Sequence, residues 1–148
     1  MPRRLLIVAC CLLAVACPAQ GIASEEPALR VAKFDVDATP PIGSPVAYAP
    51  ARSITDRLHA RGIVLLPSGQ QPIVLCAVDW IGISNGGYDL WRQTLAKAAG
   101  TTNGRVTVHS IHQHDTPRFD TSAIALFADR EQAAAHFDEA FARDVLER

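Results

Sequence analysis

Apolar and polar residues alternate in the first half of the chain, which predicts β-strands. Val31 to Asp37 has the period of two that is typical of a half-buried strand. Two β-rich runs, His59 to Leu66 and Ile73 to Asp79, are separated by a polar connection with two prolines, which predicts a hairpin. The second run is apolar at both parities, as expected for a central strand covered on both faces. The proline-rich stretch 39–54, which also contains Gly43, shows neither period and is predicted to be a loop.

A helical pattern follows and places a helix between two strands. Apolar residues recur on one side of a 3.6-residue helix at Leu90, Trp91, Leu95 and Ala98. Gly100 closes this helix, and Val106 to Ile111 is a further strand candidate. Strand, helix and strand in about 40 residues form a βαβ unit, whose strands are parallel and joined by a right-handed crossover. The fold class that we predict is α/β, with a mixed sheet that contains a parallel βαβ unit.

The end of the chain, from Asp129 to Arg148, is predicted to be one helix by the spacing of its apolar residues. No glycine or proline stops this helix before the last residue. We therefore expect either that the sequence continues in a longer protein or that this helix is a frayed natural terminus.

The first residues follow a different pattern, typical of a secretory signal peptide. Two arginines precede an apolar run from Leu5 to Cys17, which is followed by small residues. This run is shorter than the roughly 20 residues that a membrane-spanning helix needs. We therefore predict a signal peptide at 1–23, export to the periplasm or the medium, and a folded domain at 24–148. The alternative is acylation of Cys17, which would anchor the exported chain to a membrane as a lipoprotein.

Composition and charge indicate a globular domain that does not bind nucleic acid. The chain is 49% hydrophobic and 20% charged, which is typical of a folded protein. It has 14 Lys and Arg against 15 Asp and Glu, so no excess of positive charge is present to bind a phosphate backbone. Cys76 is the single cysteine after the predicted signal peptide, which rules out a disulfide within the domain. Because it lies in an apolar run, we expect Cys76 to be a small buried residue.

Ionisable side chains follow both strands of the predicted βαβ unit. Asp79 ends the first strand, and His112 and His114 come directly after the second. The carboxyl ends of parallel strands meet at one edge of a sheet, so we expect these three residues to lie close together. Asp79 is predicted either to cap the end of its strand or to orient an imidazole.

The spacing of His112 and His114 is typical of a metal site. Alternate residues of a strand point to the same face, which places the two imidazoles roughly 6.6 Å apart along the chain, at about 3.3 Å per residue. At this separation both can bind one cation, or one can bind the cation while the other transfers protons. The alternative is a solvated loop that contains two histidines. His109, at the other parity, is predicted to be a core or interface residue.

Three segments of the chain resemble the amino-terminal part of the neutral (alkaline, non-lysosomal) ceramidase family. They are Phe34 to Pro41, Asp56 to Trp80 and Val108 to Pro117, and together they span most of 31–117. The last segment is the most specific. The family shows Thr-His-Thr-His-Ser-Gly-Pro at the end of the corresponding strand, and this chain shows Ser-Ile-His-Gln-His-Asp-Thr-Pro. Asp and Thr replace the family's Ser and Gly, which implies a difference in pocket shape and substrate.

The resemblance implies a zinc-dependent amidohydrolase that cleaves an N-acyl amide such as ceramide. In such an enzyme His112 would be a zinc ligand, and His114 would help to hold the metal or its bound water and face the substrate. His114 and Asp79 are accordingly the predicted catalytic residues. The family's other zinc ligands, a His, a Glu and a Tyr, lie further downstream than Arg148. The resemblance therefore implies a partial domain of a larger metal-hydrolase fold, inactive when it is alone.

Two other interpretations of the sequence stay open. One is a small exported α/β module that binds a ligand or a partner through its histidines without catalysis. The other is a degenerate gene product without activity. The partner that we predict is a small-molecule or lipid amide substrate, and a lipid substrate would also bring the chain to a membrane surface.

Overall fold

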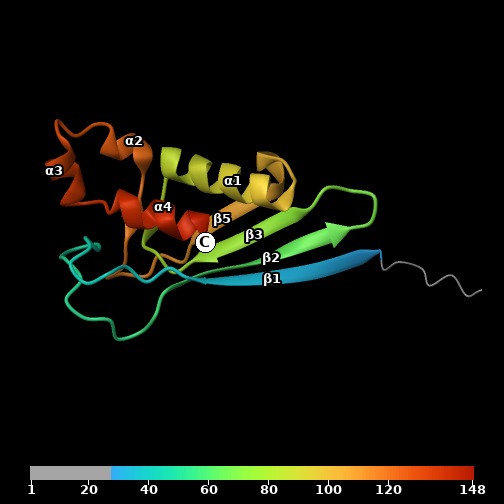
Figure 1. Cartoon of the computed structure of the whole chain (residues 1–148), viewed down its shortest axis with the longest axis horizontal. Coiled ribbons are helices and arrows are strands. Elements are labelled where there is room, and N and C mark those ends of the chain that lie inside the picture. The colour runs from blue at the N-terminus through green and yellow to red at the C-terminus, as the bar shows by residue number, and fades with distance from the viewer. Residues whose placement is uncertain (1–27) are drawn as a thin grey trace, which may run out of the picture.

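The computed structural model of the protein describes residues 28–148, and it shows a β-sheet with helices packed on one of its faces (Figure 1). The predicted signal peptide at 1–23 and the acylation site at Cys17 lie outside the described residues. Within the described part of the chain, no helix combines the length and the apolar composition that a membrane crossing needs.

The main sheet has the strand arrangement that the sequence predicts. Its strands are Leu29–Asp37 (β1), His59–Pro67 (β2), Ile73–Val78 (β3) and Val106–Ser110 (β5). Their order across the sheet is β1-β2-β3-β5; β2 is antiparallel to both β1 and β3, and β5 is parallel to β3. Helix α1 (Asn85–Ala99) connects β3 to β5. The α/β class, the hairpin and the mixed sheet with a parallel βαβ unit are therefore confirmed.

Short elements that the hydrophobic pattern does not reveal follow β3 and β5. They are β4 (Gly82–Ile83), a 3-10 helix (Asn103–Arg105), β6 (Arg118–Phe119) and α2 (Thr121–Ile124). Strands β4 and β6 form a small parallel sheet of their own. The carboxylate of Asp120 starts α2 by accepting hydrogen bonds from the amides of Ser122 at 3.0 Å and Ala123 at 3.1 Å. Elements this short depend on local caps and pairing, so they leave no periodic signal.

The prediction of one helix at the end of the chain is wrong, because the chain breaks at Asp138. The structure has two helices there, α3 (Arg130–Ala134) and α4 (Glu139–Glu147). Asp138 is the N-cap of α4, since its carboxylate accepts a hydrogen bond from the amide of Phe141 at 3.0 Å. Its other oxygen accepts a hydrogen bond from the hydroxyl of Ser44 at 2.6 Å. The break therefore ties the loop before β2 to the helix layer.

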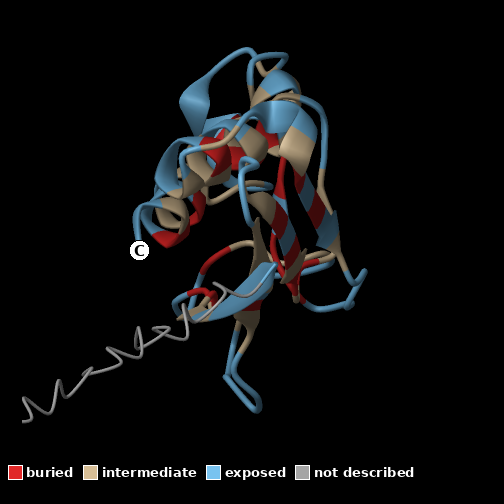
Figure 2. Ribbon diagram, turned by 90° about the vertical axis from the view of Figure 1, so that its right-hand side faces the viewer, coloured by how far each residue is buried: buried red, intermediate tan, exposed pale blue. Residues whose placement is uncertain are grey.

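The hydrophobic core lies between the sheet and the helix layer, where the buried residues gather (Figure 2). Trp80, directly after β3, is fully buried and packs edge-on against Trp91 of α1, with ring centroids 5.6 Å apart. It also packs against Phe141 of α4, at 5.8 Å. Its indole N–H donates a hydrogen bond to the carbonyl oxygen of Ala38 at 3.0 Å. One tryptophan thus joins both helices to the sheet.

Only one face of the main sheet is covered, which corrects the prediction for β3. Val74, Cys76 and Val78 face the helices and are buried, whereas Leu75 is exposed. Its register partner on β2, Ile63, is exposed as well. Helices α1 and α4 both lie on the same side of the sheet (Figure 1). An unbroken apolar run does not show whether a strand is covered on both faces or on one.

Two glycines let the first turn of α1 pack closely against its neighbours. A Cβ atom on Gly87 would lie 2.6 Å from the carbonyl oxygen of Phe119, and one on Gly86 would lie 2.8 Å from the hydroxyl of Ser122. The first turn of α1 can therefore approach the connection between β6 and α2 only because these positions carry no side chain. Gly100 ends the helix as predicted, with a left-handed backbone at φ 65°.

Candidate functional site

The carboxyl ends of β3 and β5 lie side by side, as the βαβ prediction requires. Val78 is the register partner of Ser110, and the amide of Ile111 donates a hydrogen bond to the carbonyl oxygen of Val78 at 3.0 Å. Asp79 follows directly after β3, and the loop 111–117 follows β5. The loop with the two histidines therefore begins beside Asp79 at one edge of the sheet.

His112 does not continue the strand, because its backbone is left-handed with φ 61°. Its Nδ1–H donates a hydrogen bond to the carbonyl oxygen of Ile81 at 2.8 Å. A carbonyl can only accept, so Nδ1 carries the proton and the neutral ring presents an unprotonated Nε2. A metal-binding histidine is usually oriented in this way, by its second ring nitrogen. The exposed ring of His112 thus has one nitrogen held and the other available to a ligand.

His114 lies beside His112, with ring centroids 5.3 Å apart and an interplanar angle of 80°. Its Nδ1 is hydrogen-bonded to the hydroxyl of Tyr48 at 2.9 Å. The Tyr48 and His114 rings are also in contact, with centroids 5.7 Å apart. The two imidazoles therefore come together as predicted, but through the path of a loop and not through the alternation of a strand.

The loop that carries the histidines is attached at both ends to the peptide of Ile81. The carbonyl oxygen of Ile81 accepts the hydrogen bond from His112, and its amide donates one to the carbonyl oxygen of Pro117 at 3.1 Å. Thr116 is buried, and its hydroxyl donates a hydrogen bond to the carbonyl oxygen of Gln113. The histidine side chains are exposed, but the backbone below them is fixed.

Asp79 lies where the sequence places it and has a different contact. Its carboxylate accepts a hydrogen bond from the amide of His59 at 2.9 Å, and its own amide donates to the carbonyl oxygen of His59 at 2.9 Å. Among the described residues it forms no hydrogen bond to His112 or His114. These contacts join the end of β3 to the start of β2. The predicted role of orienting an imidazole is filled by Ile81 at His112 and by Tyr48 at His114.

A second group of charged side chains lies on the open face of the sheet, and no pattern in the sequence indicated it. Asp35 accepts hydrogen bonds from His59 at 2.6 Å and from Arg61 at 3.0 Å. The hydrogen bond from His59 is the largest cause that lowers the pKa of Asp35. A shallow pocket of about 520 Å³ lies beside this group and includes His109, which is exposed instead of forming part of the core. Cross-strand pairing brings these residues together, so their separation in sequence gives no signal.

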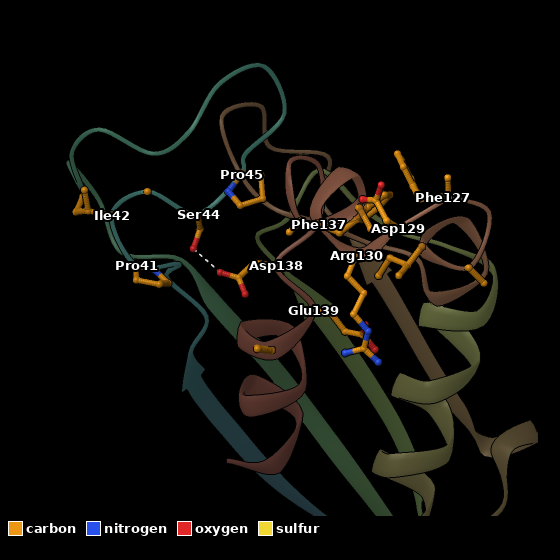
Figure 3. A pocket seen from close by; sticks show the side chains of 17 residues that line it. Pro41, Ile42, Ser44, Pro45, Phe127, Asp129, Arg130, Phe137, Asp138 and Glu139 are labelled. Atoms are coloured by element: carbon orange, nitrogen blue, oxygen red, sulfur yellow. Dashed lines mark hydrogen bonds between the residues drawn. The ribbon is translucent and has the colours of Figure 1, made fainter.

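Two pockets lie at the helix layer, and one of them includes His112. The smaller one has a volume of about 420 Å³ and is lined by His112 together with Ile81, Arg118 and Phe119. The larger one has a volume of about 910 Å³ and lies between the loop 41–45 and the segment 124–140 (Figure 3). Phe137 lines both pockets.

The donor atoms around the histidines fit zinc in kind but not in number. Neutral imidazole is a common zinc ligand, and His112 is oriented to offer Nε2. In the part of the chain that the structure describes, no group of three or more His, Cys, Asp or Glu side chains is arranged to hold a metal ion. Catalytic zinc usually has three protein ligands. The described residues therefore form at most a part of such a site.

Comparison with known proteins identifies a related fold. The sequence matches no known family, and it matches no curated protein. A solved structure, "Ceramidase complexed with C2", superimposes with a TM-score of 0.54 at 16% sequence identity. The match covers 80% of this chain and 19% of that protein, so the chain spans about a fifth of the ceramidase's length. At this level of identity the match shows a shared fold, consistent with a partial domain of a ceramidase-like fold.

Proposed function

We propose that this chain is the part of an exported, ceramidase-like metal hydrolase that supplies two zinc ligands, His112 and His114. The observation that carries this proposal is the orientation of the two rings. His112 is held through Nδ1 by the Ile81 carbonyl, and the ring of His114 lies 5.3 Å away with its own Nδ1 engaged by Tyr48. Both rings therefore keep Nε2 free of these contacts, which is the arrangement that a shared cation requires.

The proposed substrate is an N-acyl amide with a lipid chain. The fold similarity to a ceramidase supports this class, as does an apolar pocket that shares Phe137 with the pocket of His112. When bound, zinc would polarise the amide carbonyl and lower the pKa of a bound water to about 7. The residues of this chain would hold the ion and orient it: Ile81 fixes the ring of His112, and Tyr48 positions His114 for metal binding or proton transfer.

The remaining ligands of the proposed zinc site come from outside the described residues. Two imidazoles fall short of the usual three ligands, and the chain spans about a fifth of the ceramidase that it matches. We accordingly assign hydrolysis to a longer protein and metal binding of reduced affinity to this chain. The predicted export, with a signal peptide at 1–23, belongs to the same proposal.

Zinc binding to point variants tests the proposal. We expect the chain to bind about one Zn²⁺, and His112→Ala and His114→Ala each to weaken binding by at least about tenfold, measured by competition with a chromophoric chelator. Tyr48→Phe keeps the ring and removes the hydrogen bond to His114, so it should weaken binding only a few-fold. His136→Ala is the matched control, because His136 is an exposed histidine that stacks on Phe127 away from the site. If all four variants bind zinc as tightly as the unmodified chain does, the histidine pair is ruled out as ligands.

A second candidate function is a binding module without catalysis. The pocket of about 910 Å³ favours it, since neither His112 nor His114 lines that pocket. A module that binds its ligand in this pocket differs from the histidine-based module that the sequence suggests: it would bind its ligand equally well in the histidine variants and would show no specific zinc affinity. The zinc titration therefore separates the two functions.

A further inference from the structure

The large pocket between the loop 41–45 and the helices α2 to α4 has mostly apolar walls. They include Pro41, Pro45, Ile124, Phe127 and Phe137, together with several alanines. The volume of about 910 Å³ lies at the upper end of the roughly 300–1,000 Å³ that is typical of small-molecule sites. Figure 3 shows Ser44 and Asp138 on one side of this pocket and Phe127 and Asp129 on the other. These walls suit an extended hydrocarbon group.

The carboxylates that line this pocket are already engaged in structural contacts. Asp138 accepts hydrogen bonds from Ser44 and from the amide that begins α4. Asp129 caps α3 through the amide of Gln132 at 2.8 Å, and Glu139 accepts from Arg143 at 2.8 Å. None of them is left without a partner to bind a sugar or a cation. The hydrogen bond between Ser44 and Asp138 also fixes one wall of the pocket, because it joins a loop to a helix 94 residues away in sequence.

Phe137 separates this apolar pocket from the smaller one that contains His112. It lines both pockets, and its ring contacts Phe127 across the larger one, with centroids 6.1 Å apart. A chain that fills the larger pocket would therefore end against Phe137, and a group attached to that end would face the pocket of His112.

We propose that the larger pocket binds the single alkyl chain of an amphiphile and that Phe137 limits how far the chain reaches toward His112. The orientation of the reacting group at His112 rests on the function proposed above; the binding of the chain itself does not. Phe137 is in this view a residue that determines chain-length specificity, and it takes no part in metal binding.

A fluorescence titration with cis-parinaric acid, an 18-carbon polyene fatty acid, tests chain binding below its critical micelle concentration. We expect saturable binding at about one site. Phe127→Ala removes a large part of the apolar wall and should weaken binding by about tenfold. Leu126→Ala is the matched control, because Leu126 directly precedes Phe127, is 87% exposed and does not line the pocket. Equal losses in both variants, or no saturable binding by the unmodified chain, would overturn the proposal.

Two further variants complete the test. One blocks the pocket without removing a core contact, and the other tests the role of Phe137. Ala134→Trp adds bulk at an exposed position on the pocket wall, so it should block the probe without removing a core contact. Phe137→Ala should join the two pockets and raise the preference for hexadecanoate over dodecanoate, measured by probe displacement, several-fold. An unchanged preference would exclude Phe137 as the limit. Zinc affinity, measured in the same variants, should stay the same, so that failure of the chain site and failure of the metal site are distinguishable.

Discussion

The two faces of the main sheet are built from the same strands, and they have opposite surroundings. On β3, Val74, Cys76 and Val78 point to the helices and are at most 1% exposed, whereas Leu75 on the other face is 40% exposed. At the edge of the same open face, Val31 of β1 is 59% exposed. The covered face contains the core, and the open face contributes cross-strand pairing and a layer of solvated side chains. The stability of the domain should therefore depend on one face far more than on the other.

The acid groups on these two faces show the same contrast. Burial raises the pKa of the Cys76 thiol on the covered face to about 12. On the open face, hydrogen bonds from Thr39, and then the charge of Arg57, lower the pKa of the Asp37 carboxyl to about 2. The covered face thus raises the pKa of its acid and favours the neutral form, because water is excluded there. The open face lowers the pKa of its acid and favours the charged form, because hydrogen-bond donors are present.

The largest difference between the two faces is expected from truncation of their side chains. Trp80→Ala removes a fully buried ring that contacts Trp91 and Phe141, and it should destabilise the domain by about 3–5 kcal/mol. Leu75→Ala on the open face should cost less than about 1 kcal/mol, because much of the side chain is already in water. Chemical denaturation of both variants measures the contrast, and similar losses would show that the open face is covered in solution.

A smaller loss of stability is expected from a substitution where α1 packs closely against the backbone of β6. Gly87→Ala would place a Cβ atom 2.6 Å from the carbonyl oxygen of Phe119, and the resulting displacement of α1 should cost about 1–3 kcal/mol. Gly104→Ala is the matched control, since nothing lies within 4 Å of a Cβ atom at that position. We expect it to be neutral or slightly stabilising in the same denaturation experiment. Equal stability of the two variants would mean that α1 packs less closely than the structure indicates.

The smallest effect is expected from Asp37 on the open face, whose titration makes the stability of the domain depend on pH. Because the pKa of Asp37 is lower in the folded chain than its usual value of 3.8, its contribution is present above about pH 3.8 and is lost as the pH falls toward 2. The carboxylate is partly exposed, so the contribution should stay below about 1 kcal/mol after solvent screening. Asp37→Asn should therefore be less stable than the unmodified chain at pH 6 and similar to it at pH 2. A constant difference in stability from pH 6 to pH 2 would assign the effect to something other than this titration.

Much of the fold could be predicted from periodicity, and the covering of the sheet could not. The strands around Phe34, Val64 and Val74 show their patterns locally, and so does the helix around Trp91. Whether Leu75 is buried depends on which side the helices pack, and this is a tertiary property that no single strand encodes. The break at Asp138 was missed because its carboxylate caps a helix while it binds a serine far away in sequence.

For the candidate site, the sequence indicated the histidines but not what orients them. His112 and His114 were found from their spacing and from their place after β5. Tyr48 lies in a loop without periodicity, and the contribution of Ile81 is a backbone carbonyl, which no side-chain pattern can reveal. Phe137 lines two pockets and lies just before the break at Asp138, which the sequence pattern did not indicate.

The proposed zinc site depends on the ring of His112, which the Ile81 carbonyl holds with the proton on Nδ1 so that Nε2 can bind zinc together with His114. Long-range ¹H–¹⁵N NMR of the histidine side chains tests it most directly, first without metal and then during a zinc titration. We expect the neutral ring of His112 to be the Nδ1–H tautomer, and the Nε2 signals of His112 and His114 to shift together as zinc is added. An Nε2–H ring for His112, or zinc-dependent shifts at other histidines alone, would contradict it.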